Sequence, residues 1–480
     1  MTSPVRDWRS HALRTVRKAL RQASDAAADA SALRNTHALC NRVLARLCKA
    51  AKAQVADVVP FETSAAARLL SQLDSANGAQ RPAIIRQLAA IIEPRATRCE
   101  LREALAAKQL AQINAMPIPA EFVDSADVPA SQDVPDRSSI SDAPAAAQIQ
   151  RYLTQRFPGA GLRLRTCVAV PGGRSKITVM MTIEPNALLP TELVVRLDRA
   201  ASAQGTRVGD EFSVLQALHG AGVRAPQPLW LEADREPLGA PFLVMRRSIG
   251  TAPGDYWSAG RASPALCRDL AALLADVHRP DAVIAWPGAA AAARDCVCEM
   301  LQVYRERWRS NTSDAAMTSG LEFTSGPGIT SGPGFALQFG YDWLERRVDC
   351  IDGSSTPVHG DVHFGNLLAT GDNIDCLTDW EFAHAGHPAD DLAFCRRQIE
   401  SVLPWSEFLK CYRAAGGRAV NAAQLQFFEI WTSLRNLTLA SIVMQTVSEG
   451  APADLQTLVI ALDARPRLEA VLLRALATAL

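Results

Sequence analysis

Residues 356–393, TPVHGDVHFGNLLATGDNIDCLTDWEFAHAGHPADDLA, form the densest group of polar side chains in the chain and contain four of its eight histidines. Within this stretch, Asn-Leu-Leu-Ala and Ile-Asp-Cys-Leu flank the turn Thr-Gly-Asp-Asn, a pattern typical of a β-hairpin. We expect a pairing that places Asp379 opposite Phe364, which makes Asn366 a diagonal cross-strand neighbour of Asp379. Asp361 lies just upstream, in the loop that leads to the same end. The pattern therefore predicts that Asp361, Asn366 and Asp379 converge.

The side chains that converge there carry oxygen. A carboxylate and an amide oxygen, with room for water, suit Mg²⁺, a hard cation that usually keeps solvent and substrate phosphate in its shell. Zinc instead prefers His or Cys ligands. The three converging side chains therefore predict a site for Mg²⁺.

The composition describes a soluble globular protein of about three units. The 480 residues are 48% hydrophobic and 21% charged, with fifty Lys and Arg against fifty Asp and Glu. A net charge of zero gives no field that would favour nucleic acid or an anionic membrane. The eleven cysteines form no C-x-x-C pair, and no signal peptide or membrane-spanning stretch stands out, so we expect a cytoplasmic protein.

The chain changes character twice along its length. Residues 1–115 have helical periodicity, with helices expected at 63–74, 80–92 and 95–113, and carry eighteen Lys and Arg against nine Asp and Glu. Residues 116–148 are rich in Pro, Asp and Ser and read as a linker. We predict a small, basic, all-α module of unknown function at 1–115, which offers a surface for a partner protein.

After the linker, the spacing of the hydrophobic residues changes from a helical period of 3.6 to a strand period of 2. Strands are expected at 162–170, 176–183, 192–197, 227–233 and 241–246, with a helix at 207–220 between the third and fourth of them. Ser263 as N-cap and Pro264 at the first helical position begin a mainly helical part. Residues 311–334 repeat Thr-Ser-Gly-Pro-Gly and predict a mobile loop.

The two polar motifs of residues 356–393 resemble those of the aminoglycoside phosphotransferase-like branch of the protein-kinase-like superfamily, which also contains choline, homoserine and hydroxy-acid kinases. The run from His359 to Asn366, HGDVHFGN, is similar to the catalytic loop of that family, and Asp379-Trp-Glu to its metal-binding motif. The resemblance covers about residues 150–480. It implies that Asp361 is the catalytic base, that Asn366 and Asp379 hold Mg²⁺ on the nucleotide phosphates, and that His359 packs under the loop. If Asp361 is not the base, His363 is the next candidate.

The resemblance also implies a fold and two domains. The fold class is α+β, a protein-kinase-like two-lobed fold with a five-stranded N-lobe at 149–246 and a helical C-lobe at 247–480, preceded by the all-α module. Asp391, in His-Pro-Ala-Asp-Asp, resembles the acid that braces the catalytic loop of the family; a plain helix N-cap is the equal alternative.

The nucleotide site implied by the resemblance lies in the N-lobe. The turn Gly172-Gly173-Arg174-Ser175 looks like the phosphate-covering turn of the family, and backbone near Met245 would meet adenine. Side chains alternate between the two faces of a strand, so in strand 192–197 Leu193, Val195 and Leu197 share one face and Arg196 lies on the other. We expect Arg196 to point into the cleft. The sequence departs from the family in having no lysine there. Arg196 is the first candidate for the phosphate cation, Lys176 the second, and Glu211 the expected ion-pair partner.

These observations predict an ATP- and Mg²⁺-dependent phosphotransferase that acts on the hydroxyl of a small molecule, first a hydroxylated acid or its CoA ester. An aminoglycoside or other amino-alcohol kinase is one alternative, and a non-catalytic nucleotide-binding or scaffold protein of kinase shape is another. A Walker-type NTPase is excluded because no Gly-Lys dipeptide occurs in the chain. Gly360 replaces the arginine that protein kinases carry before the catalytic Asp, which favours a small-molecule acceptor.

Overall fold

The structure is a computed structural model that describes residues 15, 16, 40, 43, 63–94, 96, 97, 144–170, 175–199, 206–279, 291–311, 333–448 and 455–480. The chain divides into two compact units. The first unit combines Met1–Asp136, Leu301–Arg346 and Ser433–Leu480, and the second combines Arg137–Met300 and Arg347–Thr432. The candidate site residues that the structure describes all lie in the second unit.

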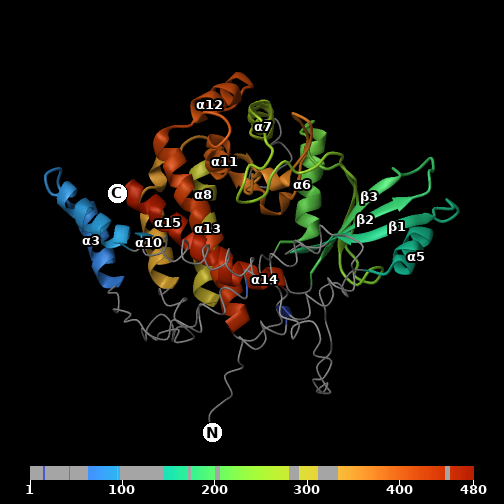
Figure 1. Cartoon of the computed structure of the whole chain (residues 1–480), viewed down its shortest axis with the longest axis horizontal. Helices are drawn as coiled ribbons and strands as arrows, with labels where there is room; N and C mark the ends of the chain where they lie inside the picture. Colours follow the sequence, from blue (N-terminus) through green and yellow to red (C-terminus); the bar gives the residue numbers. More distant parts are fainter. Residues whose placement is uncertain are drawn as a thin grey trace, which may run out of the picture. The chain divides into compact units, whose positions relative to one another are not determined.

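A five-stranded antiparallel sheet begins the second unit (Figure 1). Its strands are β1 (Leu164–Val170), β2 (Lys176–Ile183), β3 (Glu192–Asp198), β4 (Pro228–Glu232) and β5 (Phe242–Arg246), in the order β1-β2-β3-β5-β4. Helix α6 (Val208–Gly220) connects β3 to β4. The predicted five strands and their β-β-β-α-β-β order are confirmed.

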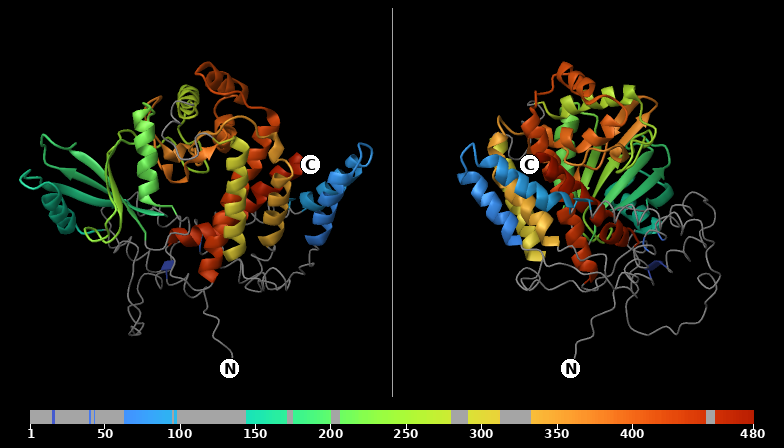
Figure 2. Two further views of the ribbon diagram at one scale, coloured as in Figure 1. Left: turned by 180° about the vertical axis from the view of Figure 1, so that it is seen from behind. Right: turned by 60° about the vertical axis from the view of Figure 1, so that its left-hand side comes forward.

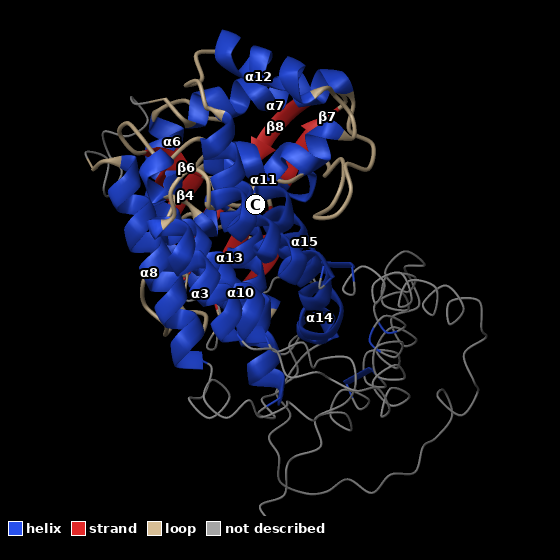
Figure 3. Cartoon of the chain, turned by 90° about the vertical axis from the view of Figure 1, so that its left-hand side faces the viewer, coloured by secondary structure: helices blue, strands red, loops and turns tan. Residues whose placement is uncertain are grey.

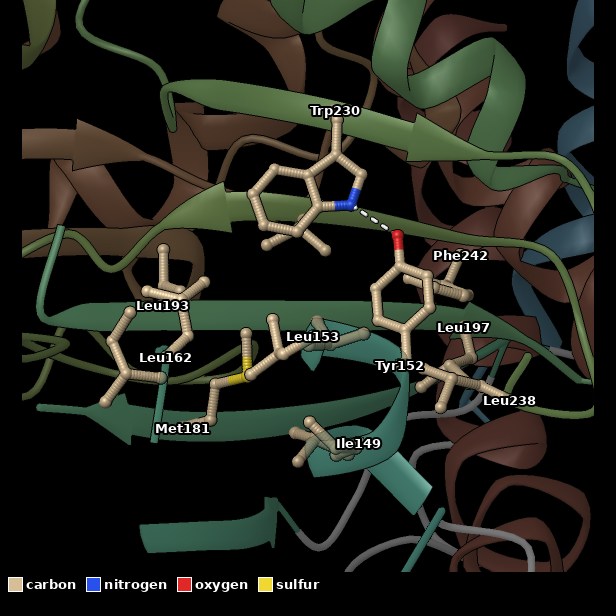
Figure 4. Close-up of a cluster of buried hydrophobic side chains, with 14 of the residues drawn as sticks. Ile149, Tyr152, Leu153, Leu162, Met181, Leu193, Leu197, Trp230, Leu238 and Phe242 are labelled. Carbon is tan, nitrogen blue, oxygen red and sulfur yellow. Dashed lines mark hydrogen bonds between the residues drawn. The ribbon is translucent and has the colours of Figure 1, made fainter. Parts of the chain in front are cut away.

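One face of this sheet packs on helix α5 (Ala146–Arg156), as Figure 1 shows. Alternate residues of each strand share that face because the side-chain period of a strand is two, and Leu193, Val195 and Leu197 are buried there as predicted. In this core, Trp230 Nε1 donates a hydrogen bond of 2.8 Å to Tyr152 Oη (Figure 4). Burying both aromatic rings therefore leaves the indole N–H satisfied.

The opposite face of the sheet packs on α6. Val208 of α6 shares a small buried cluster with Leu243 and Met245 of β5, and Val194 of β3 packs against it. Since Arg196 lies two residues beyond Val194, it is on this same face. The sheet therefore presents Arg196 to α6 and away from the apolar core.

The helical part of the second unit contains two short antiparallel strand pairs. Helix α7 (Pro264–Val277) begins at Ser263, whose Oγ accepts a 3.1 Å bond from Leu266 N, and Pro264 occupies the first turn. The other elements are β6 (Thr356–Val358) paired with β9 (His384–Gly386), β7 (Leu367–Thr370) paired with β8 (Asn373–Leu377), α11 (Ala389–Glu400) and α12 (Trp405–Ala414). Figure 3 shows α7 and α12 together beside the β7–β8 hairpin.

The β7–β8 hairpin is confirmed, and its expected register holds next to the turn, where Ala369 faces Ile374, but is wrong by one residue farther from the turn. An irregularity between Leu368 and Ala369 shifts the pairing, so Leu367 faces Leu377. Beyond the ladder, Thr378 N donates to Asn366 O at 2.8 Å, which pairs these two residues. Asp379 therefore does not lie opposite Phe364; it follows the residue that pairs with Asn366, and the two predicted metal ligands remain neighbours.

Each secondary-structure element that the structure describes in the first unit is a helix. Helix α3 (Thr63–Ser75) and the helix at 81–94 confirm two predicted helices, and the third, at 95–113, falls almost entirely outside the described residues. Helix α3 packs on α10 (Pro333–Glu345), which also contacts α15 (Arg465–Ala479) (Figure 2). Val16, Cys40 and Val43 share a core with residues near the end of α13 (Ala422–Ser448) and with α14 (Leu455–Val459).

Two further observations concern the predicted domains. Helices α8 (Ala293–Asn311) and α13 each contribute residues to both units, and residues 312–332 of the expected mobile loop lie outside the described part of the chain. The boundaries at 115, 148 and 246 stay predictions.

Among the described helices, none is long and apolar enough to cross a bilayer.

Candidate active site

Asp391, in the first turn of α11, holds the start of the 359–366 loop. Its fully buried carboxylate accepts hydrogen bonds from His359 N at 2.8 Å and Gly360 N at 2.7 Å. His278 Nε2 lies 3.1 Å from the same carboxylate, and His278 Nδ1 lies 2.9 Å from Tyr412 Oη. Burial by itself would raise the pKa of Asp391, but the hydrogen bond and charge of His278 and the His359 amide lower it below its ordinary value. Asp391 therefore braces this loop, and it is more than a plain N-cap.

His359 lies beneath the loop as a neutral side chain. Its Nδ1 accepts from Asp361 N at 3.1 Å, which leaves Nε2 as the protonated nitrogen that donates to Thr378 O at 2.9 Å. Its ring meets the Trp380 ring edge-on at 4.5 Å. Burial lowers the pKa of His359 against the opposing effects of the nearby carboxylates. The residue thus links the loop that carries Asp361 to the turn that carries Asp379.

Asp361 is flanked by two side chains of its own loop. Asn366 Nδ2 donates to the main-chain oxygen of Asp361 at 2.9 Å and to its Oδ2 at 3.1 Å. On another side, His363 Nε2 lies 3.6 Å from Asp361 Oδ2, while His363 Nδ1 accepts from Gly365 N at 3.0 Å. The two nitrogens that approach Asp361 therefore both carry hydrogen, which orients the carboxylate.

Asp379 adopts a backbone conformation that is rare for a residue with a side chain. Its φ of 68° makes it the one non-glycine residue with positive φ in the described ranges. Aspartate tolerates this left-handed region better than most residues, and such positions concentrate at functional sites. The following residue, Trp380, donates its Nε1 hydrogen to Leu377 O at 2.7 Å, which closes the turn. The turn thereby presents the Asp379 carboxylate, 34% exposed, to Arg196.

Arg196 stands between two acids from different elements. Its Nη2 lies 2.8 Å from Asp379 Oδ1, and its Nε lies 3.4 Å from Glu211 Oε2 of α6. Burial alone would lower the pKa of Arg196, but Glu211 and Asp379 raise it above its ordinary value. Burial raises the pKa of Glu211 to about 7, although Arg196 opposes the shift. The structure therefore brings Arg196, Glu211 and Asp379 together.

Lys176, the second candidate for the phosphate cation, is enclosed instead. Its ammonium group lies 3.0 Å from Asp198 Oδ1 and donates to the main-chain oxygen and the hydroxyl of Thr206. The side chain is 1% exposed, whereas that of Arg196 is 12% exposed. Three acceptors already surround the Lys176 ammonium, so it cannot reach a phosphate without leaving them.

Glu381 was not among the predicted site residues. Its Oε2 accepts hydrogen bonds from Ser175 Oγ and, at 3.1 Å, from Thr206 Oγ1. Burial and the charge of Asp379 raise the pKa of Glu381, whereas the Ser175 hydrogen bond lowers it. Its place in Asp-Trp-Glu, two residues after Asp379, was the available signal. Glu381 thus ties Ser175, at the start of the second strand, to the turn that carries Asp379.

The remaining predicted residues are placed as follows. Gly172, Gly173 and Arg174 lie outside the described residues. Met245 lies in β5, where it pairs with Val194 across the sheet, and its side chain is buried in the cluster beneath α6. The structure therefore brings together all the predicted side chains that it describes except Met245, whose expected contribution is its backbone.

Behind this site, His387 is buried in its neutral form. Its ring stacks on Phe428 at 5.7 Å, and its Nδ1 accepts from Ala389 N at 3.1 Å. Burial, reinforced by the charge of Arg418, lowers the pKa of His387 to about 3, although Asp352 opposes the shift. Folding therefore excludes a proton that the unfolded chain binds below about pH 6.5.

We expect this histidine to make the protein acid-sensitive. Because the folded-state pKa is the lower one, its contribution to stability is complete above about pH 6.5 and is lost as the pH falls towards 3. Replacing His387 with Gln should flatten the decline of the unfolding free energy over that window, measured by urea unfolding at a series of pH values. Replacing the exposed His219 with Gln is the control, and an equally steep decline in both variants would contradict the assignment.

The chain is similar to several known proteins. A model of the phosphotransferase enzyme family matches residues 166–428, and no curated protein matches the chain. Among solved structures, the macrolide 2'-phosphotransferase MphH from Brachybacterium faecium is similar at 18% identity and a TM-score of 0.43, covering 65% of this chain and 97% of its own. A choline/ethanolamine kinase family protein from Mesorhizobium loti shows 15% identity and a TM-score of 0.43, covering 68% and 98%. A thermostable mutant of an aminoglycoside phosphotransferase, in complex with AMP-PNP and hygromycin B, shows 15% identity and a TM-score of 0.45, covering 69% and 99%.

Proposed function

We infer the reaction from the fact that this chain belongs to the phosphotransferase enzyme family. It is an ATP-dependent phosphotransferase of small molecules. We propose that it phosphorylates a hydroxyl group, with Asp361 as the base and Arg196 as the cation that pairs the nucleotide phosphates. The observation that carries this proposal is the position of Arg196, held at once by Glu211 of α6 and by Asp379 of the Asp-Trp-Glu turn.

Asp361 is suited to act on the acceptor. Its carboxylate is partly exposed and is held on one side by the Asn366 amide, so it is oriented before the acceptor arrives. A carboxylate within hydrogen-bond distance of the acceptor hydroxyl accepts its proton as the oxygen attacks the terminal phosphate. The bracing by Asp391 and His359 keeps the loop in place while this happens, because their bonds are made to its backbone.

The residues present fit a magnesium ion. Both Nδ2 hydrogens of Asn366 are directed at Asp361, so its side-chain oxygen is the atom left to act as a ligand. Asp379 supplies a carboxylate from the adjacent turn, and oxygen donors of this kind are those that Mg²⁺ prefers. Bound there, Mg²⁺ would neutralise charge on the nucleotide phosphates. Among the described side chains, no group of three His, Cys, Asp or Glu could hold a metal ion.

The acceptor that we favour is a hydroxylated acid or its CoA ester. An aminoglycoside, as a polycation, needs carboxylates that are free to bind it. Two carboxylates of the site are already engaged, Asp379 by Arg196 and Glu381 by two hydroxyl groups. A panel of hydroxylated small molecules, scored for ADP formation with Mg-ATP, tests this proposal. Activity restricted to aminoglycosides would move the assignment to that class, and an absence of nucleotide binding would favour the scaffold alternative.

We expect Arg196 and Lys176 to respond differently to substitution. Arg196→Ala should weaken Mg-ATP binding about tenfold to a hundredfold, because a charge-assisted phosphate contact is lost. Lys176→Ala should lower the unfolding free energy, since it removes the buried ammonium group that Asp198 and Thr206 bind, with little effect on nucleotide affinity. Calorimetric titration with Mg-ATP measures the nucleotide affinity of both variants, and urea unfolding measures their stability.

Two further variants make this comparison decisive. Arg196→Lys keeps a charge but loses the planar fork that reaches Asp379 and Glu211 together, so a full loss in this variant indicates that the site needs the fork. Arg247→Ala, in an exposed ion pair with Glu192, is the surface control. If Lys176→Ala weakens Mg-ATP binding and Arg196→Ala does not, the phosphate cation has been assigned wrongly.

A further inference from the structure

Three aromatic rings lie beside Asp361, on the side occupied by His363. The Tyr256 and His363 rings meet edge-on at 5.4 Å, and the Phe394 ring of α11 lies 6.3 Å from Tyr256 and 6.5 Å from His363. We call these three residues the ring cluster. Because His363 Nε2 is 3.6 Å from Asp361 Oδ2, the cluster borders directly on the proposed base.

The ring cluster extends outward through a more exposed aromatic residue. Trp257 packs edge-on against Tyr256 at 4.8 Å and is 37% exposed, and Tyr256 and Phe394 are themselves half-buried. An aromatic surface of this kind binds apolar or planar groups through its ring faces. The rings are therefore arranged from the surface of the unit inward to the base.

Tyr256 owes its place to Gln398 of α11. Gln398 Nε2 donates to the main-chain oxygens of Asp255 at 2.7 Å and Tyr256 at 3.0 Å, while its Oε1 accepts from Phe364 N at 3.0 Å. One carboxamide thus ties the segment after the sheet to the loop that carries Asp361. The side chain is 8% exposed, so these bonds are shielded from competition by water.

The close packing around Gly365 fits the same arrangement. A Cβ atom at Gly365 would lie 2.8 Å from the His363 ring and 3.2 Å from Asp255 Cα. Only glycine lets the His363 ring and the Asp255 backbone approach the loop together at that distance. The approach of the 255–256 segment to the base loop is therefore built into the chain at two points, Gly365 and Gln398.

We propose that Gln398 is a positioning residue that holds the ring cluster beside Asp361, and that the ring cluster is the wall on which the phosphate acceptor lays an apolar or aromatic face. This inference rests on the proposed function, because the acceptor approaches Asp361 only if Asp361 is the base. It narrows the acceptor to molecules in which an apolar or aryl group lies next to the phosphorylated hydroxyl.

The substrate part of the proposal is tested with paired acceptors. Each pair consists of a small hydroxy acid and the same acid with a phenyl group added near its hydroxyl. The pairs are lactate with 3-phenyllactate and glycolate with mandelate. Kanamycin is included as a polycationic acceptor. We expect kcat/KM to be at least about tenfold higher for the aryl member of a pair. Tyr256→Ala should remove that preference and Tyr256→Phe should keep it.

The positioning part is tested with two substitutions of Gln398. Gln398→Met removes all three hydrogen bonds, whereas Gln398→Glu keeps an acceptor for Phe364 N and loses the two donors to Asp255 and Tyr256. Both should raise the KM for the acceptor about tenfold or more and leave the KM for ATP unchanged. If Gln398→Glu behaves like the wild type, the Phe364 bond alone matters and the proposed role in holding Tyr256 is wrong.

Gln424→Met is the matched control. Gln424 is also a buried glutamine that makes three side-chain hydrogen bonds, to Cys350 O, Asp352 Oδ1 and Asn421 N, in the same unit. Its loss should lower stability without changing either KM. Equal effects of Gln398→Met and Gln424→Met on the acceptor KM would reduce Gln398 to a merely structural residue.

The failure of this inference is distinguishable from that of the proposed function. A wild type that binds Mg-ATP in calorimetry but prefers kanamycin, or turns over neither aryl acceptor, overturns the ring-cluster proposal and leaves the phosphotransferase assignment intact. A wild type that binds no Mg-ATP contradicts the proposed function itself.

Discussion

Replacing Asp361 with Asn is expected to lower turnover by about 10² to 10⁴ while Mg-ATP affinity stays within about twofold of the wild type. An amide of the same size keeps an oxygen towards Asn366 Nδ2, 3.1 Å away in the structure, so the loop is not disturbed. What the variant loses is the capacity to accept a proton from the acceptor hydroxyl. The measurement combines steady-state ADP formation with calorimetry of Mg-ATP binding.

The comparison variant for this experiment is Asp349→Asn. Asp349 pairs with Arg294 on the surface and is 83% exposed, so its loss should change neither quantity. If Asp361→Asn turns over at the wild-type rate, the base lies elsewhere. His363, whose Nε2 lies 3.6 Å from Asp361, would be the next candidate, and His363→Gln would then carry the loss.

The second large effect is expected at Asp379. Asp379→Ala should weaken Mg²⁺-dependent ATP binding by about 100-fold or more, because it removes the one charged ligand of the proposed metal site. It also leaves Arg196 without its 2.8 Å partner, so the phosphate cation is no longer held over the site. Calorimetric titrations with Mg-ATP, and with ATP in the presence of a chelator, separate the two contributions.

Asp379→Asn separates loss of the ligand from backbone strain. Both aspartate and asparagine tolerate the left-handed conformation that this residue adopts, with a φ of 68°, whereas alanine does not. Asp379→Asn should therefore fold like the wild type and still bind Mg-ATP poorly. Wild-type affinity in that variant would refute the assignment of Asp379 as a metal ligand.

The strands, the β7–β8 hairpin and the face of Arg196 were predictable because each depends on a local period of two. The alternation that buries Leu193, Val195 and Leu197 necessarily turns Arg196 to the other face. The register error arose from one irregularity after Leu368, a feature that residue type alone does not reveal. Local pattern thus located the site to within one residue.

The contacts that the sequence did not reveal join residues far apart in the chain. Ser175 and Glu381 are 206 positions apart, and Gln398 lies 143 positions from Asp255. Lys176 illustrates the consequence. Beside a glycine-rich turn it suggests a phosphate ligand, yet Asp198 and Thr206 enclose its ammonium group, and only tertiary packing places them there. Pairings of this kind depend on how the elements dock, which no local period specifies.

The division of the chain between its two units has a consequence for synthesis on the ribosome. The second unit is completed only when Thr432 has been made, because Arg347–Thr432 supplies the base loop and α11 to a sheet that begins before residue 170. At roughly 5–20 residues per second, the sheet, complete at Arg246, waits about 10–40 s for Thr432. During that interval Arg196 and Glu211, on the face of the sheet that α6 covers, lack the Asp379 carboxylate of the Asp-Trp-Glu turn. A fragment that stops at Met300 would remain in that state permanently, so the catalytic unit has to be produced from a chain that continues at least to Thr432.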